Sequence, residues 1–149
     1  MPTYTVTCPA GRLSGEHKRL IAAKITSAHS QGTGAPMFFA QVIFSEVAEG
    51  DHYLGGEPLS GDQIFIHGQI RAGRSAQIKT DLMMRIVADV GAATGIPPGR
   101  IWVYISELPP NQMVEFGRVL PEPGAEEAWT SAMPAEDRAR LEKLGRKLS

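Results

Sequence analysis

The sequence predicts an α/β (α+β) fold in which a four-stranded mixed sheet carries two helices on one face, followed by a short C-terminal helix. Three observations lead to this prediction: an internal repeat, the same strand–helix–strand order in each copy, and a glycine–proline signal after both helices. The 149 residues suit one domain. We therefore expect a single domain over 1–149, with βαβ repeats at about 2–46 and 63–108 and an extension at 109–149.

The repeat appears when the chain is shifted by 61 residues. The segment "TGAPMFFAQVIFSE" (33–46) then falls on "TGIPPGRIWVYISE" (94–107), and Ser14, Lys18 and Ile25 fall on identical residues of the second copy. The identities gather at turn residues. This pattern indicates an early duplication of one unit.

Each copy reads as a strand, a helix and a second strand. The expected strands are 3–8, 38–44, 64–70 and 101–108. Ser14 and Ser75 are expected to cap the helices, which carry apolar stripes and stop at Thr-Gly-x-Pro. The stripes comprise Ile21, Ile25 and Ala28 in the first helix, and Ile78, Leu82, Ile86 and Val90 in the second. A βαβ unit pairs its strands in parallel and lays its helix on one sheet face.

The second sheet face needs a covering partner, because strand 64–70 is apolar on both sides, with Ile66 on one and Phe65 on the other. Other copies of the chain are the simplest candidate, and the C-terminal segment is the alternative. Segment 46–62 predicts a hairpin or lid, and 133–149 predicts a final helix with Pro134 in its first turn.

Composition excludes several function classes. Lys and Arg (15) nearly balance Asp and Glu (16), so nothing indicates nucleic acid or an anionic membrane as a partner. The single cysteine, Cys8, allows no internal disulfide, and the histidines show no metal-ligand spacing. No apolar run reaches the ~18 residues of a membrane span, and the start lacks signal-peptide features. We expect a soluble cytoplasmic protein without metal or cofactor.

Pro2 stands directly behind the initiator methionine. A proline is tolerated at the first position of a strand. If Met1 is removed, however, Pro2 gains a free secondary amine that can give or take a proton. Its counterpart in the second repeat, Gln63, lies inside the chain and has no such amine.

Two arginines bracket a glycine in "IRAGRS" (70–75), immediately before the Ser75 helix cap. A helix N-terminus and planar guanidinium groups together favour an anion such as a carboxylate. The alternative is that one arginine pairs with a structural acid while the other is solvated. The first repeat lacks arginines at these positions, so Arg71 and Arg74 are a specialisation of the second. Equivalent strand ends could bring them near Pro2 at one sheet edge.

The combination is similar to the tautomerase superfamily, whose members work through an amino-terminal proline on βαβ repeats. It most resembles the cis-3-chloroacrylic acid dehalogenase family, through "MP", "AHS", "FFAQV", "LGG", "IFIHG", "RAGRS", "IWVYISELP", "QMVEFGR" and "LPEPG". The functional positions that this resemblance implies are Pro2, His29, Arg71, Arg74, Tyr104 and Glu115. Without the resemblance, each of three residues has a structural interpretation. His29 would complement the dipole at the end of a helix, Tyr104 would be a core residue of a strand, and Glu115 would be a solvated surface residue. The sequence departs from the family in loop 30–38, which bears on substrate preference.

The resemblance implies addition of water to a small unsaturated carboxylate, such as a 3-haloacrylate giving malonate semialdehyde. Arg71, Arg74 and His29 would bind the carboxylate. Glu115, with Tyr104, would activate water, and Pro2 as ammonium would protonate the α-carbon. Hydration of an acetylenic acid is a variant. The family also implies a homo-oligomer, a trimer.

Two other readings stay open. In a tautomerase of enol–keto acids such as phenylpyruvate, Pro2 would be a neutral general base; nearby arginines would lower the pKa of its amine and Glu115 would raise it. A non-catalytic oligomeric binding protein would merely share the fold, and retention of Met1 would favour it.

Overall fold

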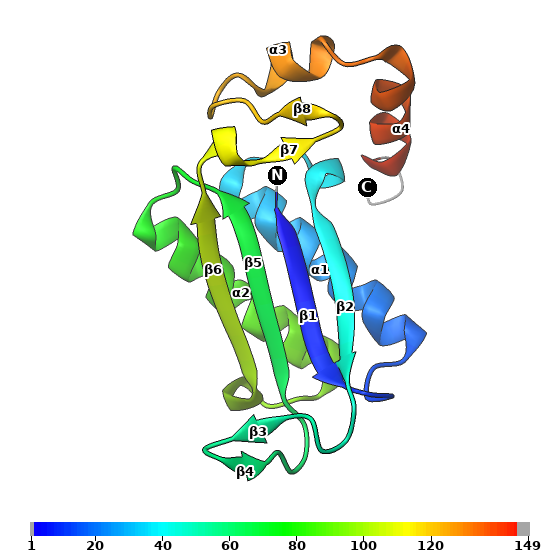
Figure 1. Ribbon diagram of the computed structural model, residues 1–149, viewed down its shortest axis with the longest axis vertical. Coiled ribbons are helices and arrows are strands. Elements are labelled where there is room, and N and C mark those ends of the chain that lie inside the picture. The colour runs from blue at the N-terminus through cyan, green and yellow to red at the C-terminus, as the bar shows by residue number, and fades with distance from the viewer. Residues whose placement is uncertain (1, 146–149) are drawn as a thin grey trace.

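The computed structural model describes residues 2–145 and contains the expected mixed sheet (Figure 1). Its strands lie in the order β2-β1-β5-β6, with β1 parallel to β2, β5 parallel to β6, and β1 antiparallel to β5. Both long helices, α1 and α2, lie behind this sheet. The bounds are β1 Thr3–Pro9, α1 Gly15–Thr33, β2 Gln41–Val47, β5 Ile64–Arg71, α2 Ala76–Thr94 and β6 Ile101–Leu108.

Helix caps recur in both halves at the predicted positions. The hydroxyls of Ser14 and Ser75 accept a hydrogen bond from the backbone N–H three residues on, at 3.1 and 3.2 Å. Gly34 and Gly95 end the helices in the left-handed conformation, with φ of 74° and 73°. Since local capping defines both helices, their bounds differ by the same 61 residues as the sequence repeat.

A matching ion pair joins each helix to the end of its second strand. Lys18 contacts Glu46 at 2.7 Å, and Lys79 contacts Glu107 at 2.6 Å. These residues occupy equivalent places in the two copies. The duplication therefore extends to a tertiary contact.

The second strand of the first copy was predicted too early. Residues Met37–Phe39 form a 3-10 turn, and β2 begins at Gln41. The same 3-10 turn recurs 61 residues later, at Pro98–Arg100 before β6, so it belongs to the repeated unit. In the first copy Phe39 of this turn is buried against the C-terminal extension, in a cluster with Leu120, Trp129, Met133 and Leu141.

The C-terminal extension packs against one end of the sheet and leaves its front face open (Figure 1). Ile43, Trp102 and Tyr104 on that face are 41–55% exposed. The alternative that the C-terminal segment covers this face is therefore wrong for residues 109–145. The helical face is the core, although Ile78 of the predicted stripe is only partly buried.

Short elements complete the chain. The predicted hairpin between the repeats is β3 (Tyr53–Leu54) paired with β4 (Glu57–Pro58). The extension contains a second hairpin, of β7 (Val114–Glu115) and β8 (Arg118–Val119), and a short helix, α3 (Glu126–Ser131). The last helix, α4 (Ala135–Gly145), begins after Pro134 and not with it; residues 146–149 of the predicted helix lie outside the described part. No helix in residues 2–145 is long and apolar enough to cross a membrane.

Antiparallel pairing of the two repeats brings opposite strand ends together. Thr3 at the start of β1 pairs with Gln69 near the end of β5. The expectation that equivalent strand ends meet is thus wrong in detail. The start of the first repeat lies beside the end of the strand that leads to the two arginines.

Candidate active site

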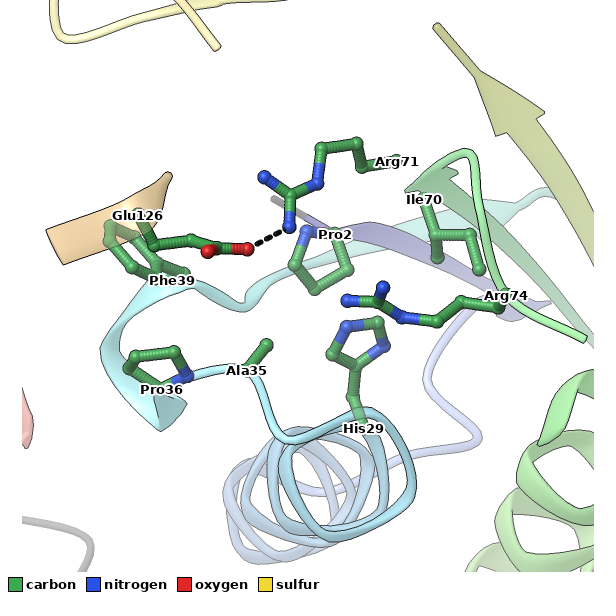
Figure 2. A pocket seen from close by; sticks show the side chains of 9 residues that line it. All are labelled: Pro2, His29, Ala35, Pro36, Phe39, Ile70, Arg71, Arg74 and Glu126. Carbon is green, nitrogen blue, oxygen red and sulfur yellow. Dashed lines mark hydrogen bonds and ion pairs between the residues drawn. The ribbon is translucent and has the colours of Figure 1, made fainter. Parts of the chain in front are cut away.

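A small pocket lies at this meeting point (Figure 2). Pro2 enters it ahead of β1, His29 from the last turns of α1, and Arg71 from the end of β5. Its full lining is Pro2, His29, Ala35, Pro36, Phe39, Ile70, Arg71, Arg74 and Glu126. The cavity volume of this pocket is only about 30 Å³. That is roughly twice what one water molecule requires, so the pocket suits a small ligand.

His29 is buried and held by a second buried side chain. The Tyr4 hydroxyl lies 2.8 Å from Nδ1 of His29, and the two residues are 0% and 5% exposed. Burial raises the pKa of the Tyr4 phenol, so the hydroxyl stays protonated and can donate to Nδ1. We assign the ring proton of neutral His29 to Nε2 accordingly.

The same burial keeps His29 uncharged. Loss of hydration, followed by the nearby charge of Arg74, lowers the pKa of His29 to about 4. At neutral pH the ring is therefore a hydrogen-bond donor through Nε2 and carries no charge. The neutral ring can donate a hydrogen bond to a carboxylate and adds no positive charge beside the arginines.

Arg71 is largely enclosed, and two of its guanidinium nitrogens make hydrogen bonds. One nitrogen donates to the carbonyl of Pro121 at 2.8 Å, and another pairs with the carboxylate of Glu126. Figure 2 shows this ion pair beside the Pro2 ring. The alternative that one arginine pairs with a structural acid therefore holds for Arg71.

Glu126 is ionised in this position. Burial is the largest single influence and raises the pKa of its carboxyl, but the hydrogen bonds from Arg71 and the backbone, together with the charge of Arg71, bring the pKa below its usual value. The second carboxylate oxygen accepts from the backbone N–H of Gly124 at 2.8 Å. Glu126 is thus a fixed negative charge on the pocket wall.

Arg74 comes from the loop between β5 and α2. Its backbone N–H donates to the Glu107 carboxylate at 3.3 Å, which anchors the loop. Its guanidinium lies beside the His29 ring (Figure 2) and makes no ion pair with a carboxylate in residues 2–145. Arg74 is therefore the pocket cation that is available to an incoming anion.

A wider groove adjoins the pocket. Its volume is about 540 Å³, and Arg74 and Glu126 line both the groove and the pocket. Its other walls are segment 33–36 and the α3 side chains Glu127, Thr130 and Ser131. The groove gives a larger ligand room beyond the pocket itself.

Two of the predicted site residues lie elsewhere within one chain. Tyr104 is on the open sheet face, 55% exposed, with its ring packed edge-on against Phe65 at 5.0 Å between centroids. Glu115 lies in β7 and lines a separate groove that includes Thr3. The chain thus brings together Pro2 and the three residues predicted to bind a carboxylate, and leaves the two residues predicted to activate water outside that pocket.

Sequence reasoning missed Glu126. It lies 55 residues from Arg71 along the chain, in a short helix without a side-chain cap. The only signal was indirect: the expectation that an arginine of "RAGRS" pairs with an acid.

As to metals, residues 2–145 contain no group of three or more His, Cys, Asp or Glu side chains arranged to hold an ion.

Comparison with known proteins agrees with this geometry. A crystal structure of N1, a member of the cis-3-chloroacrylic acid dehalogenase (cis-CaaD) family, superposes with a TM-score of 0.90 at 36% identity, covering 95% of this chain and 99% of that one. A fused 4-OT wild type asymmetric trimer is similar in fold, with a TM-score of 0.73 at 24% identity over 78% of this chain and 94% of that one. A "Probable tautomerase" of Bacillus cereus is 38% identical over 60 residues, 40% of this chain and 97% of the relative.

A match to a family covers almost the whole sequence. Residues 1–133 match Tautomerase_3, described as "Putative oxalocrotonate tautomerase enzyme". The mixed sheet, the paired helices and the N-terminal proline beside two arginines are consistent with that assignment. The chain therefore belongs to the Tautomerase_3 family of the tautomerase superfamily.

Proposed function

We propose that this protein adds water to a small unsaturated carboxylate and uses the Pro2 amine, freed by removal of Met1, as its proton donor. The observation that supports this most is that Pro2 lines the same small pocket as His29, Arg71 and Arg74. A proton donor and a carboxylate-binding set in one enclosed space are what such an addition needs.

The proposed reaction balances as follows for cis-3-chloroacrylate. Water gives one proton to the Glu115 carboxylate as its oxygen bonds to the chlorine-bearing carbon C3, a proton from Pro2 goes to C2, and the carbon–carbon double bond becomes single. The resulting halohydrin loses chloride and its hydroxyl proton to give malonate semialdehyde. Arg74 and the Nε2–H of His29 hold the carboxylate and draw electrons from C3 toward it.

Water activation is assigned to Glu115 and Tyr104. Glu115 is in the extension, in the groove that includes Thr3, next to Pro2 in sequence. Tyr104 lies on the open apolar face, so its role requires a second copy of the chain. A homo-oligomer, and specifically a trimer, is supported by that uncovered face and by the trimeric assemblies among structures of the same fold.

A second candidate is a tautomerase acting on a larger enol–keto acid such as phenylpyruvate. The groove of about 540 Å³ beside the pocket favours it, because an aromatic ring could lie there while Arg74 binds the carboxylate. Here Pro2 would act as a neutral base, with its amine pKa lowered by the arginines.

The test is a panel of halogenated, acetylenic and enolisable acids, with products identified by NMR. We expect chloride release from cis-3-chloroacrylate, and a loss of about 10²–10⁴-fold in Pro2→Ala. Pro9→Ala, at the far end of β1, is the matched control and should retain activity. Unchanged chloride release in Pro2→Ala would refute the proposal. Fast phenylpyruvate tautomerisation with no hydration would favour the second candidate, and inactivity on the whole panel would favour a binding protein.

A further inference from the structure

We propose that Glu126 restricts the site to ligands with a single carboxylate. Its carboxylate already neutralises Arg71, the more enclosed of the two pocket arginines. Of the two arginines, therefore, only Arg74 has a positive charge that a ligand can neutralise. The inference rests on the proposed carboxylate-binding function and adds to it the charge of the substrate class.

The surroundings of the pocket support this restriction. A second carboxylate on a ligand would lie either against Glu126 or in the adjoining groove. That groove is lined by Glu126 and Glu127, and its one cationic residue is Arg74, which is shared with the pocket. Once the first carboxylate of a doubly charged acid has paired with Arg74, and with Pro2 engaged as the proton donor, the second carboxylate meets the negative side chains of Glu126 and Glu127.

Hydrogen bonds to both oxygens hold the Glu126 carboxylate in place on the pocket wall. One carboxylate oxygen contacts Arg71 and the other accepts from the N–H of Gly124. If this side chain swung away, the largely enclosed guanidinium of Arg71 would lose its carboxylate partner, which is costly. Glu126 thus acts as a specificity-determining residue on the pocket wall.

The experiment measures binding of two three-carbon acids, propionate with one carboxylate and malonate with two, by calorimetry at pH 7. The readout is the ratio of their dissociation constants, which does not depend on turnover. We expect the wild-type protein to prefer propionate. Glu126→Gln should shift the ratio toward malonate by about tenfold, the order expected when a like charge a few ångströms away is removed.

Two further variants complete the design. Glu127→Gln removes a groove charge without touching the Arg71 pair, and should shift the ratio the same way by about two- to threefold. It keeps the test valid if Glu126→Gln does not fold. Glu122→Gln, an exposed acid of the same extension outside the pocket and the groove, is the control and should leave the ratio unchanged.

The outcomes separate the two proposals. A ratio that stays within twofold of wild type in folded Glu126→Gln, or an equal shift in Glu122→Gln, would overturn the role of Glu126 while leaving the carboxylate site intact. If neither acid binds the wild-type protein, the carboxylate site fails, and this inference fails with it.

Discussion

Acidification should destabilise the protein through His29. The ring is 5% exposed, and burial together with Arg74 lowers its pKa to about 4, against about 6.5 in an unfolded chain. Between these two values the unfolded state binds a proton that the folded state excludes. Stability contributed by His29 is therefore fully present above pH 6.5 and is lost as the pH falls toward 4.

The size of this effect follows from the two pKa values. Between pH 7.5 and pH 4.5, the His29 contribution to the free energy of unfolding should fall by roughly 2 to 3 kcal/mol. Carboxylates held in ion pairs, such as Glu107, add their own acid sensitivity. The contribution of His29 is therefore isolated as a difference between the wild-type protein and His29→Gln.

The assay is urea unfolding of both proteins at the two pH values and at one fixed protein concentration, since an oligomer unfolds in a concentration-dependent way. We expect the wild-type protein to lose about 2 to 3 kcal/mol more than His29→Gln over this range. Equal losses would show that His29 is not held neutral by the fold, and the argument from burial would be refuted.

Two further predictions concern the packing behind the pocket. Tyr4→Phe removes the hydroxyl donor to Nδ1 of His29 and should cost about 1–3 kcal/mol in urea unfolding, while ¹⁵N NMR of the wild-type protein should show the proton of the neutral ring on Nε2; a proton on Nδ1 would contradict the assigned direction of this hydrogen bond. Gly68→Ala should lower stability by about 1–3 kcal/mol or more, because its Cβ would lie 2.5 Å from Cε1 of Tyr4 and 2.9 Å from Cδ1 of Ile105. Gly99→Ala, which meets nothing within 4 Å, is the control, and equal stability of the two variants would argue against this close packing.

Local signals account for what the sequence predicted well. Both long helices follow from a serine cap and a glycine C-cap that act within a few residues, so their bounds could be read directly. The start of β2 was placed too early because the apolar run 38–44 hides the 3-10 turn at Met37–Phe39, which recurs at Pro98–Arg100 in the second copy. The hairpin of β7 and β8 has strands of two residues, too short to show any periodicity.

Some residues of the candidate site could be predicted from the sequence, and others are evident only in the folded chain. Pro2, Arg71 and Arg74 could be proposed together because the repeat placed an amine in one copy and a guanidinium pair in the other. The contact between Arg71 and Glu126 joins residues 55 apart in segments with no shared pattern, so only the folded chain reveals it. The roles of Tyr104 and Glu115 stay predictions, since one chain does not bring them into the pocket.

The central claim is that Pro2 carries an ionisable amine beside the arginine pair, and ¹⁵N NMR of ¹⁵N-proline-labelled protein tests it most directly. We expect one proline nitrogen to titrate with pH, and its pKa to rise in Arg74→Ala because a nearby positive charge is lost. If no proline nitrogen titrates, Pro2 is an amide and the proposed catalysis is contradicted. A titration that Arg74→Ala leaves unchanged would place the amine away from the arginine that the account assigns to the substrate.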